Sequence, residues 1–227
     1  MHTCVIVTAD LRTVGAPDGR VLDSNERRRC QELHRDSDRL RSSAGATLLR
    51  VVSGALLKVD PIELAVDRTC PRCGLLHGKP QLPGHRLNVS VSHSGALVQV
   101  AATMAGQVGI DIQCADVKLT DSTHRMLEEA LHIGSPADTL SAWSRLEAFH
   151  KATGEGLLAG LDALSIRTRT YALQTVSFKG RSVTCFIEDQ AQYNGYVGAV
   201  VVLTNRPLSI LTTDLRGWDM PLSFDAT

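Results

Sequence analysis

The spacing of apolar and polar residues predicts short strands and helices in mixed order. Residues 3–11 (TCVIVTADL) are apolar and rich in β-branched side chains, which is typical of a buried strand. Residues 22–59 repeat their apolar positions at helical spacing, and Ser24 is a candidate N-cap. We expect two helices in this segment, meeting near residues 36–38.

The middle of the chain predicts a loop followed by three strands. Residues 67–86 are dense in Gly, Pro and Cys, which favour loops. Residues 87–104 (LNVSVSHSGALVQVAATM) have the pattern of two strands around a turn at Ser94 and Gly95. Residues 107–113 (QVGIDIQ) form the next predicted strand.

The remaining residues predict helices and then strands. The helices are expected at about residues 120–133 and 138–153. Strands are expected at residues 164–170, 171–178, 181–189 and 195–203. Because the order strand, helices, strands occurs twice, we expect an α+β fold with two similar α/β halves, residues 1–106 and 107–227. Beyond one last strand, the tail from residue 206 has no assignable pattern.

Composition and charge exclude several classes of protein. The 227 residues carry 24 basic and 24 acidic side chains, so no net charge attracts the chain to nucleic acid or a membrane. No apolar run approaches the roughly 20 residues that cross a bilayer, and no signal peptide opens the sequence. Six scattered cysteines form no disulfide framework. We expect a cytoplasmic protein with reduced thiols and neither nucleic-acid nor membrane partners.

Two motifs carry the strongest candidate chemistry. Asp111 and Gln113 lie two residues apart on a predicted strand and therefore share one face. Glu147 and Lys151 share one face of a predicted helix with Trp143. The alternative for the helix is an exposed Glu–Lys pair worth about 0.2–0.5 kcal/mol. Carboxylate and amide oxygens are hard ligands that suit Mg²⁺ or Mn²⁺, and the lysine would neutralise a phosphate.

Other polar residues are weaker candidates. His93 lies in a turn beside Ser92, Lys79 precedes a proline, and Arg41 precedes small residues on a helix. Each of these is more often an ordinary solvated side chain. The halves of the chain differ in charge, with a balance of +4 before residue 107 and −4 after it. This division suits an anionic ligand and a cation that share a cleft.

Taken in order, these motifs resemble the Sfp-type (surfactin-type) 4′-phosphopantetheinyl transferases. The chain carries GKP, SHS, VGIDIQ and WSRLEAFHK, at residues 78–80, 92–94, 108–113 and 143–151. The resemblance runs from about Arg27 to Val201, most of the chain. It implies a two-part, pseudo-symmetric fold of this family, with coenzyme A as substrate in the cleft between the halves.

The resemblance also implies roles for the acidic motifs. Asp111, Gln113 and Glu147 match the metal-binding positions, where Mg²⁺ also contacts the pyrophosphate. Glu147 matches the general base, which takes the proton from a serine of an acyl or peptidyl carrier protein. That oxygen attacks the β-phosphate of coenzyme A, and 3′,5′-ADP leaves. Lys151 matches the lysine that holds the pyrophosphate, so the expected catalytic residues are Glu147, Lys151 and Asp111.

The basic motifs match positions that hold the nucleotide phosphates. These are Arg41, Lys79, His93 with its neighbour Ser92, and Arg29. Because both halves are present in one chain, the resemblance implies a monomer that acts on carrier proteins. The sequence does not indicate which carriers it modifies.

Two departures from the family pattern leave an alternative open. Leu146 stands where the family usually has lysine, and Gln113 replaces the commoner glutamate. They are the support for a catalytically altered coenzyme A-binding homologue that acts as a regulatory partner. A Mg²⁺-dependent nuclease is a third hypothesis, which the lack of a basic stripe with interleaved aromatic residues disfavours.

The loop of residues 67–86 holds four potential zinc ligands, Cys70, Cys73, His77 and His85. The two cysteines have a zinc-knuckle spacing, but the histidines are farther apart than usual. We favour a loop that lies against adenine above two free thiols. Structural zinc is the less favoured alternative.

Overall fold

The computed structural model describes residues 2–116, 120, 123, 125, 136–156, 172–190, 193–219 and 222. The strand predicted at residues 164–170 and most of the helix predicted at 120–133 lie outside the described residues. No helix in the described part is long and apolar enough to cross a membrane.

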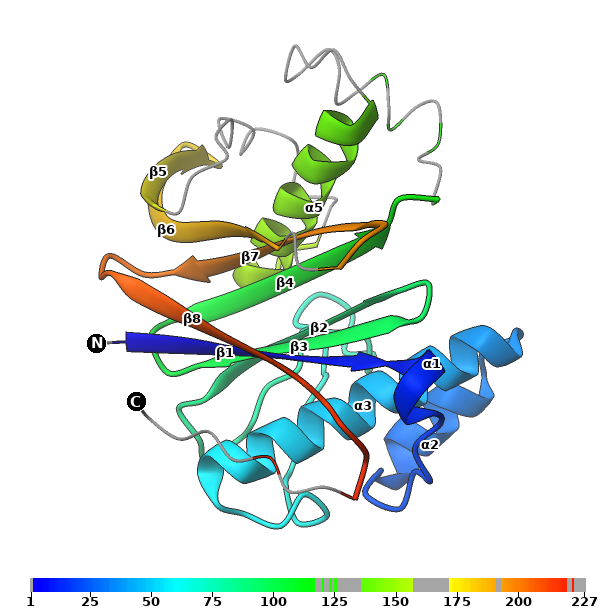
Figure 1. Ribbon diagram of the computed structural model, residues 1–227. Coiled ribbons are helices and arrows are strands. Elements are labelled where there is room, and N and C mark those ends of the chain that lie inside the picture. Colours follow the sequence, from blue (N-terminus) through cyan, green and yellow to red (C-terminus); the bar gives the residue numbers. More distant parts are fainter. Residues whose placement is uncertain are drawn as a thin grey trace.

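Two four-stranded sheets form the centre of the molecule (Figure 1). The first has the order β2-β3-β1-β8 and comprises β2 (Asn88–Ser94), β3 (Leu97–Thr103), β1 (His2–Asp10) and β8 (Leu208–Asp214). The second has the order β4-β7-β6-β5 and comprises β4 (Gln107–Cys114), β7 (Tyr196–Leu203), β6 (Arg181–Gln190) and β5 (Ala172–Phe178). Neighbouring strands are antiparallel except β1 and β8, which are parallel.

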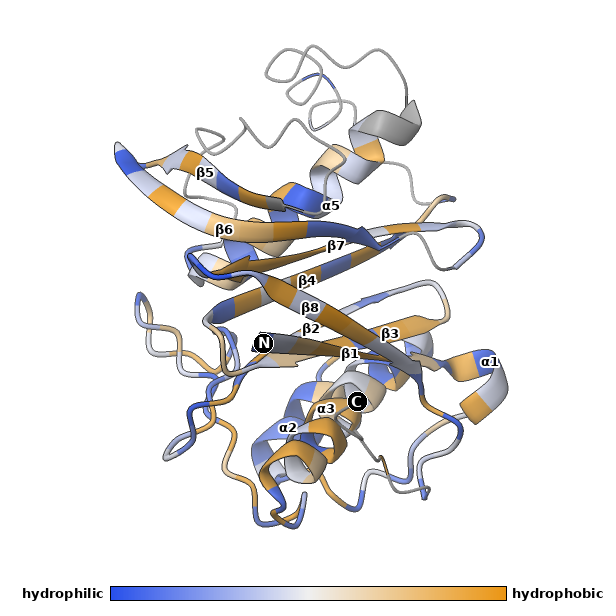
Figure 2. Cartoon of the chain, turned by 60° about the vertical axis from the view of Figure 1, so that its left-hand side comes forward, coloured by the Kyte–Doolittle hydropathy of each residue, from blue (hydrophilic) through white to orange (hydrophobic). Residues whose placement is uncertain are grey.

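Helices cover the outer faces of the sheets and complete four layers. The described helices are α1 (Leu11–Val14), α2 (Ser24–Gln31), α3 (Asp36–Leu57) and α5 (Pro136–Thr153). Helix α3 packs on the first sheet, and α5 packs on β4 and β7 of the second (Figure 1). The apolar colouring of the central strands agrees with their position between other layers (Figure 2).

Strand periodicity explains how each sheet contributes to two hydrophobic clusters. In β1, Val5 and Val7 belong to the cluster between α3 and the first sheet, whereas Cys4 and Ile6 belong to the cluster between the two sheets. Side chains of successive residues point to opposite faces, so one apolar strand supplies both clusters. A third cluster, which includes Phe149, joins α5 to the second sheet.

A row of serines joins the edge strand of one sheet to the edge strand of the other. The hydroxyls of Ser90, Ser92 and Ser94 accept backbone N–H bonds from β4 at 3.1, 3.2 and 2.9 Å. Their donors are Ile110, Ile112 and Cys114. Alternate residues of β2 share one face, so all three hydroxyls reach the same neighbour. The unpaired edge of β4 is thereby satisfied by side chains rather than by another strand.

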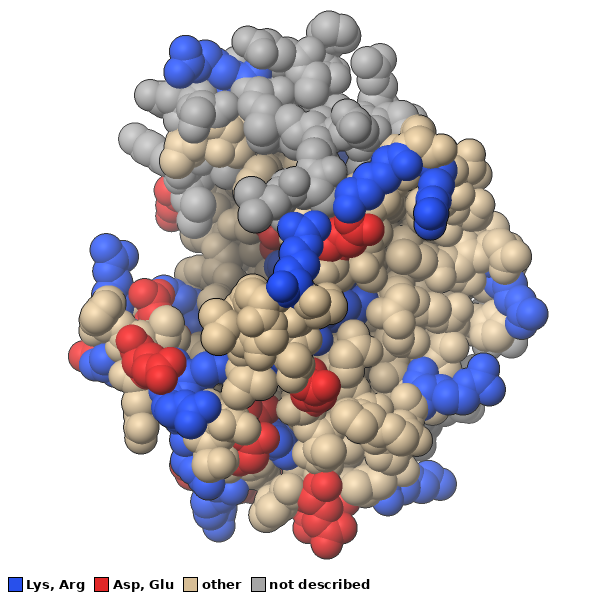
Figure 3. Space-filling view, turned by 180° about the vertical axis from the view of Figure 1, so that it is seen from behind, with Lys and Arg blue, Asp and Glu red and all other residues tan. Residues whose placement is uncertain are grey.

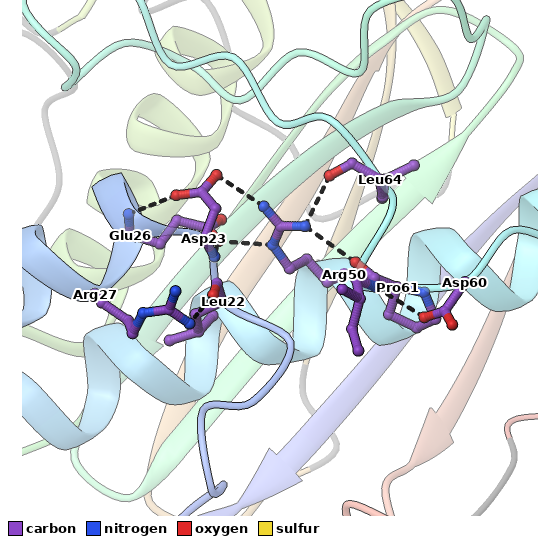
Figure 4. Close-up of polar contacts among 9 residues, drawn as sticks. Leu22, Asp23, Glu26, Arg27, Arg50, Asp60, Pro61 and Leu64 are labelled. Atoms are coloured by element: carbon purple, nitrogen blue, oxygen red, sulfur yellow. Dashed lines mark hydrogen bonds and ion pairs between the residues drawn. The ribbon is translucent and has the colours of Figure 1, made fainter.

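A buried arginine fixes the helices beneath the first sheet (Figure 4). Arg50 is 1% exposed and forms ion pairs with Glu26 at 2.6 Å and Asp23 at 2.9 Å. It also donates to the backbone carbonyls of Pro61 and Leu64 at 3.0 and 2.7 Å. The network connects the start of α2 to α3 and to residues 61–64, which precede the cysteine-containing loop (residues 67–86).

Several predictions can now be compared with the structure. The α+β fold is confirmed, with two sheets and covering helices. Ser24 as N-cap is wrong: Asp23 is the cap, because its carboxylate accepts the Glu26 N–H at 2.8 Å while Glu26 accepts the Asp23 N–H at 3.1 Å. The two helices are separated by residues 32–35. The tail contains β8, which pairs with β1 in the first sheet.

The charged surface agrees with the balanced composition. On the face opposite to that of Figure 1, basic side chains over α2 and the start of α3 are interspersed with acidic ones (Figure 3). In this region Arg28 lies 3.9 Å from Glu32 and Arg41 lies 2.6 Å from Asp38. Such pairing gives this surface no single-sign field.

Candidate active site

Asp111 is the centre of a buried polar network where β4, β2 and α5 meet. One carboxylate oxygen accepts hydrogen bonds from the Lys151 ammonium at 2.6 Å and the Ser92 hydroxyl at 3.0 Å. The other accepts from the Gln113 amide at 2.9 Å and the Ser144 hydroxyl at 3.1 Å. Asp111 is 1% exposed, so these four donors, one of which is positively charged, stabilise a carboxylate removed from water.

Gly109 allows α5 to lie directly against the strand that carries Asp111. A Cβ atom at this position would lie 1.9 Å from the Ala148 carbonyl oxygen and 2.5 Å from the Ala152 nitrogen, both in α5. Glycine is therefore the residue that this close approach requires. The contact brings Glu147 and Lys151, one helical turn apart, beside the strand motif.

Glu147 offers a carboxylate that the other described residues leave available. Burial and the nearby negative charge of Asp111 raise the pKa of Glu147, while Lys151 partly opposes them. Among the described residues, no hydrogen bond or ion pair is found for its carboxylate. The side chain lines two adjoining cavities, and a ligand or cation can reach it there.

The two cavities form one cleft at the site. They have volumes of about 600 and about 340 Å³, within the range of small-molecule sites. Both are lined by Arg68, Val91, Glu147 and Lys151. The larger cavity continues along the loop of Cys70, and the smaller one reaches Arg29. An elongated ligand that occupies both cavities would pass Glu147 where they join and Asp111 within the smaller one.

Arg68 is a functional candidate that the sequence reading missed. Burial, with the positive charge of Arg29 beside it, lowers the pKa of Arg68 to about 10. Within the described part of the chain, its buried Nε atom has no hydrogen-bond partner. A partly buried cation whose buried Nε has no partner among the described residues, on the wall of a cleft, suits a ligand anion. Nothing in its local sequence distinguishes it from a surface arginine.

Two of the other predicted phosphate ligands line the cleft, and Arg41 is not found on its walls. Arg29 and His93 line the smaller cavity, and desolvation with the charges of Arg41 and Lys151 lowers the pKa of His93. Arg41 is not among the residues found to line the two cavities, and it donates to the Gly95 carbonyl at 3.1 Å.

Lys79 lines the larger cavity but is held by protein oxygens. Its ammonium donates to the Gln107 side chain and to the Ala152 carbonyl, each at 2.8 Å. Burial lowers the pKa of Lys79 to about 8. The side chain links the cysteine-containing loop to the end of α5, which is a positioning contact the sequence did not predict.

The contacts of the motif in α5 differ from those of an exposed Glu–Lys pair. Lys151 binds Asp111 and the Ser92 hydroxyl, the latter at 3.0 Å, so it is not half of an exposed pair with Glu147. Ser92 thus bridges Lys151 and Asp111 on the cavity wall. Leu146 is fully buried, and this position therefore serves packing rather than charge pairing.

The oxygen donors fit a divalent cation. Asp111, Gln113 and Glu147 all line the smaller cavity. The two carboxylates are close enough for the charge of Asp111 to raise the pKa of Glu147, and a cation between them would relieve this repulsion. Carboxylate and amide oxygens are the ligands that Mg²⁺ and Mn²⁺ prefer.

The fold and the cleft together define a class of protein. Acidic groups from a strand and a helix, a lysine between them and arginines on the walls are typical of an enzyme that handles a phosphate-bearing ligand with a divalent cation.

Comparison with known proteins narrows this class. The chain is 25% identical over 177 residues to a 4′-phosphopantetheinyl transferase of Bacillus subtilis, covering 73% of this chain and 75% of the relative. It is 28% identical over 169 residues to a phosphopantetheinyl transferase of Thraustochytrium, covering 63% of this chain and 56% of that relative. No protein-family profile matches the chain. The resemblance found in the motifs is thus confirmed, and these relatives support a transferase enzyme of this kind.

Proposed function

We propose that this chain transfers the 4′-phosphopantetheine arm of coenzyme A to a serine of an acyl or peptidyl carrier protein and releases 3′,5′-ADP. The supporting observation is that Asp111, Glu147 and Lys151 line one cavity together, and that Glu147 and Lys151 also line the adjoining larger cavity, with Arg68 on the wall of both. The names of the two relatives point to the same reaction. In this proposal residues 1–106 and 107–227 act as pseudo-symmetric halves of a monomer, with coenzyme A between them.

Each side chain has a role set by its surroundings. Glu147 takes the proton of the attacking serine, because its carboxylate faces the cleft and its raised pKa makes it a better base than an ordinary surface carboxylate. Lys151 and Arg68, which both line the two cavities, neutralise phosphate oxygens. Ser92 and Ser144 hold Asp111 in position.

Mg²⁺ would be held by Asp111, Gln113 and Glu147, and when bound it supplies charge neutralisation of the pyrophosphate. The amide nitrogen of Gln113 donates to Asp111, so the amide oxygen of Gln113 is left for the cation or for a water molecule. The proposal therefore keeps Mg²⁺ as the metal, with Mn²⁺ as a substitute of similar ligand preference.

The proposal is tested by incubating the protein with coenzyme A, Mg²⁺ and an apo carrier protein, and measuring the carrier's mass. A gain of one phosphopantetheine group is expected. Asp111→Asn and Glu147→Gln, which keep the side-chain shapes, should each lower the transfer rate by about 100-fold or more, equivalent to about 2.7 kcal/mol or more of barrier. Ser177→Ala, at an exposed position of β5, is the control and should leave the rate unchanged.

If the carriers stay unmodified while coenzyme A still binds, the transferase hypothesis is wrong and the regulatory coenzyme A-binding homologue is favoured. Wild-type rates in either acidic-site variant would show that the reaction takes place elsewhere. Circular dichroism of each variant distinguishes loss of chemistry from loss of fold.

A further inference from the structure

The loop that walls the larger cavity is closed on itself by backbone hydrogen bonds. Asp67 and Gln81 form an antiparallel bridge with N–H to carbonyl distances of 3.0 and 2.8 Å. Within it, the Gly78 N–H donates to the Arg68 carbonyl at 2.7 Å. A Cβ at Gly78 would lie 2.9 Å from that carbonyl oxygen, so the two arms of the loop touch.

This closure brings three potential metal ligands together. The ligand atoms of Cys70, Cys73 and His77 all lie within 4.8 Å of one another, and the Cys73 sulfur is 2.9 Å from His77 Nε2. Ligand atoms around a tetrahedral zinc ion are about 3.5–3.8 Å apart, given Zn–S bonds of about 2.3 Å and Zn–N bonds of about 2.0–2.1 Å. A cation therefore fits among the three after small side-chain adjustments.

The backbone around the cysteines also has the form of a metal-binding turn. The N–H groups of Arg72 and Cys73 donate to the Cys70 sulfur, so the backbone of this turn folds around it. Gly74 follows with φ of +73°, a left-handed conformation that glycine adopts without strain. This turn brings both sulfurs to the same side of the loop, where His77 also lies.

We propose that Cys70, Cys73 and His77 bind one zinc ion that fixes the wall of the larger cavity. Two thiolates and an imidazole favour zinc over Mg²⁺, so this site differs in chemistry from the oxygen site at Asp111. His85 is not part of the cluster formed by the described residues. The three ligands line the cavity, which leaves the fourth position for water or for a group of the bound ligand.

The zinc ion has a consequence for the cleft. It holds the segment that ends at Gly78 and Lys79, and Lys79 in turn contacts β4 and α5. Loss of the ion should loosen this wall and weaken nucleotide binding. This consequence rests on the proposed function, whereas zinc binding itself does not.

Zinc content is the direct test. The tag-free protein, purified from medium without added zinc and desalted, should contain about one zinc ion per chain by plasma mass spectrometry. Cys73→Ser and His77→Ala should each lower this content at least tenfold, while Cys114→Ser, at a half-buried cysteine outside the cluster, should not. Cobalt substitution should give the near-ultraviolet absorption of thiolate-bound Co²⁺ in the wild type and in Cys114→Ser. The two ligand variants should lack this absorption.

Two results would overturn the site. The first is a wild-type protein that contains no zinc even after incubation with the ion and desalting. This result counts against the site also when the cause is a disulfide between Cys70 and Cys73. The other is full zinc content in both ligand variants. Calorimetry with 3′,5′-ADP then tests the consequence for the cleft. Binding about tenfold weaker to the zinc-free, still folded protein than to the zinc-loaded protein supports this consequence. Equal binding to both forms refutes the consequence but leaves the zinc site itself unaffected.

Discussion

Replacement of Gly109 by alanine tests whether the contact between β4 and α5 sets the geometry of the site. The new Cβ atom would lie 1.9 Å from the Ala148 carbonyl oxygen, and such contacts are not found below 3.0 Å. The helix and the strand must therefore move apart by about 1.1 Å. The position of a Cβ atom is fixed by the backbone, and the Ala148 oxygen is itself a backbone atom, so no side-chain rotation relieves the clash.

The displacement should affect catalysis more than folding. Overpacking of this kind costs about 1–3 kcal/mol of stability. The Lys151–Asp111 bond of 2.6 Å would lengthen beyond hydrogen-bonding distance if the whole shift fell on it. Because a misplacement of about 1 Å can lower a rate by about 100-fold, we expect kcat of Gly109→Ala to fall by about that factor.

Gly106→Ala is the matched control for this experiment. Its Cβ would lie 2.0 Å from the Leu203 carbonyl oxygen in β7, a clash of similar severity that does not involve α5. Urea unfolding should show a loss of stability in both variants, while initial transfer rates should show the large loss of kcat in Gly109→Ala alone. Wild-type kcat in Gly109→Ala, or an equal loss in Gly106→Ala, would refute the reasoning.

Three further substitutions test the buried network, the support of Asp111 and the unassigned arginine. Arg50→Met should cost about 3–5 kcal/mol in urea unfolding because it leaves the buried Glu26 carboxylate uncompensated. Arg20→Ala, at an exposed ion pair, should cost at most about 1 kcal/mol. Ser144→Ala removes a hydrogen bond to Asp111 and should lower kcat about tenfold, equivalent to about 1.4 kcal/mol, with an unchanged rate arguing against the support role. Arg68→Ala should raise KM for coenzyme A about tenfold at nearly constant kcat, and an unchanged KM would exclude it from the nucleotide site.

Local spacing determined much of the fold and part of the site. The β-branched runs predicted the strands now seen as β1, β3, β4 and β7, and the helical period predicted α3. Spacing of two on a strand placed Asp111 and Gln113 on one face, and spacing of four on a helix did the same for Glu147 and Lys151. Such relations depend only on the backbone repeat, so the sequence contains them directly.

The tertiary structure decided the contacts between segments distant in the chain. Lys151 pairs with Asp111 across 40 residues, and Ser92 bonds to both. Arg68 enters both cavities, although its local sequence marks no site. The tail strand β8 completes the first sheet beside β1, far from it in sequence. These pairings arise when layers bury their apolar faces against one another, and no local period specifies which surfaces will meet.

The cysteine-containing loop shows the same division within a short segment. The sequence supplied Cys70 and Cys73 at a metal-binding spacing and left the histidine partner open. Backbone closure at Gly78 selected His77 over His85, because it folds the arm that carries His77 back onto the cysteines. Residue spacing thus determined which ligands were available, and the path of the folded chain determined which of them came together.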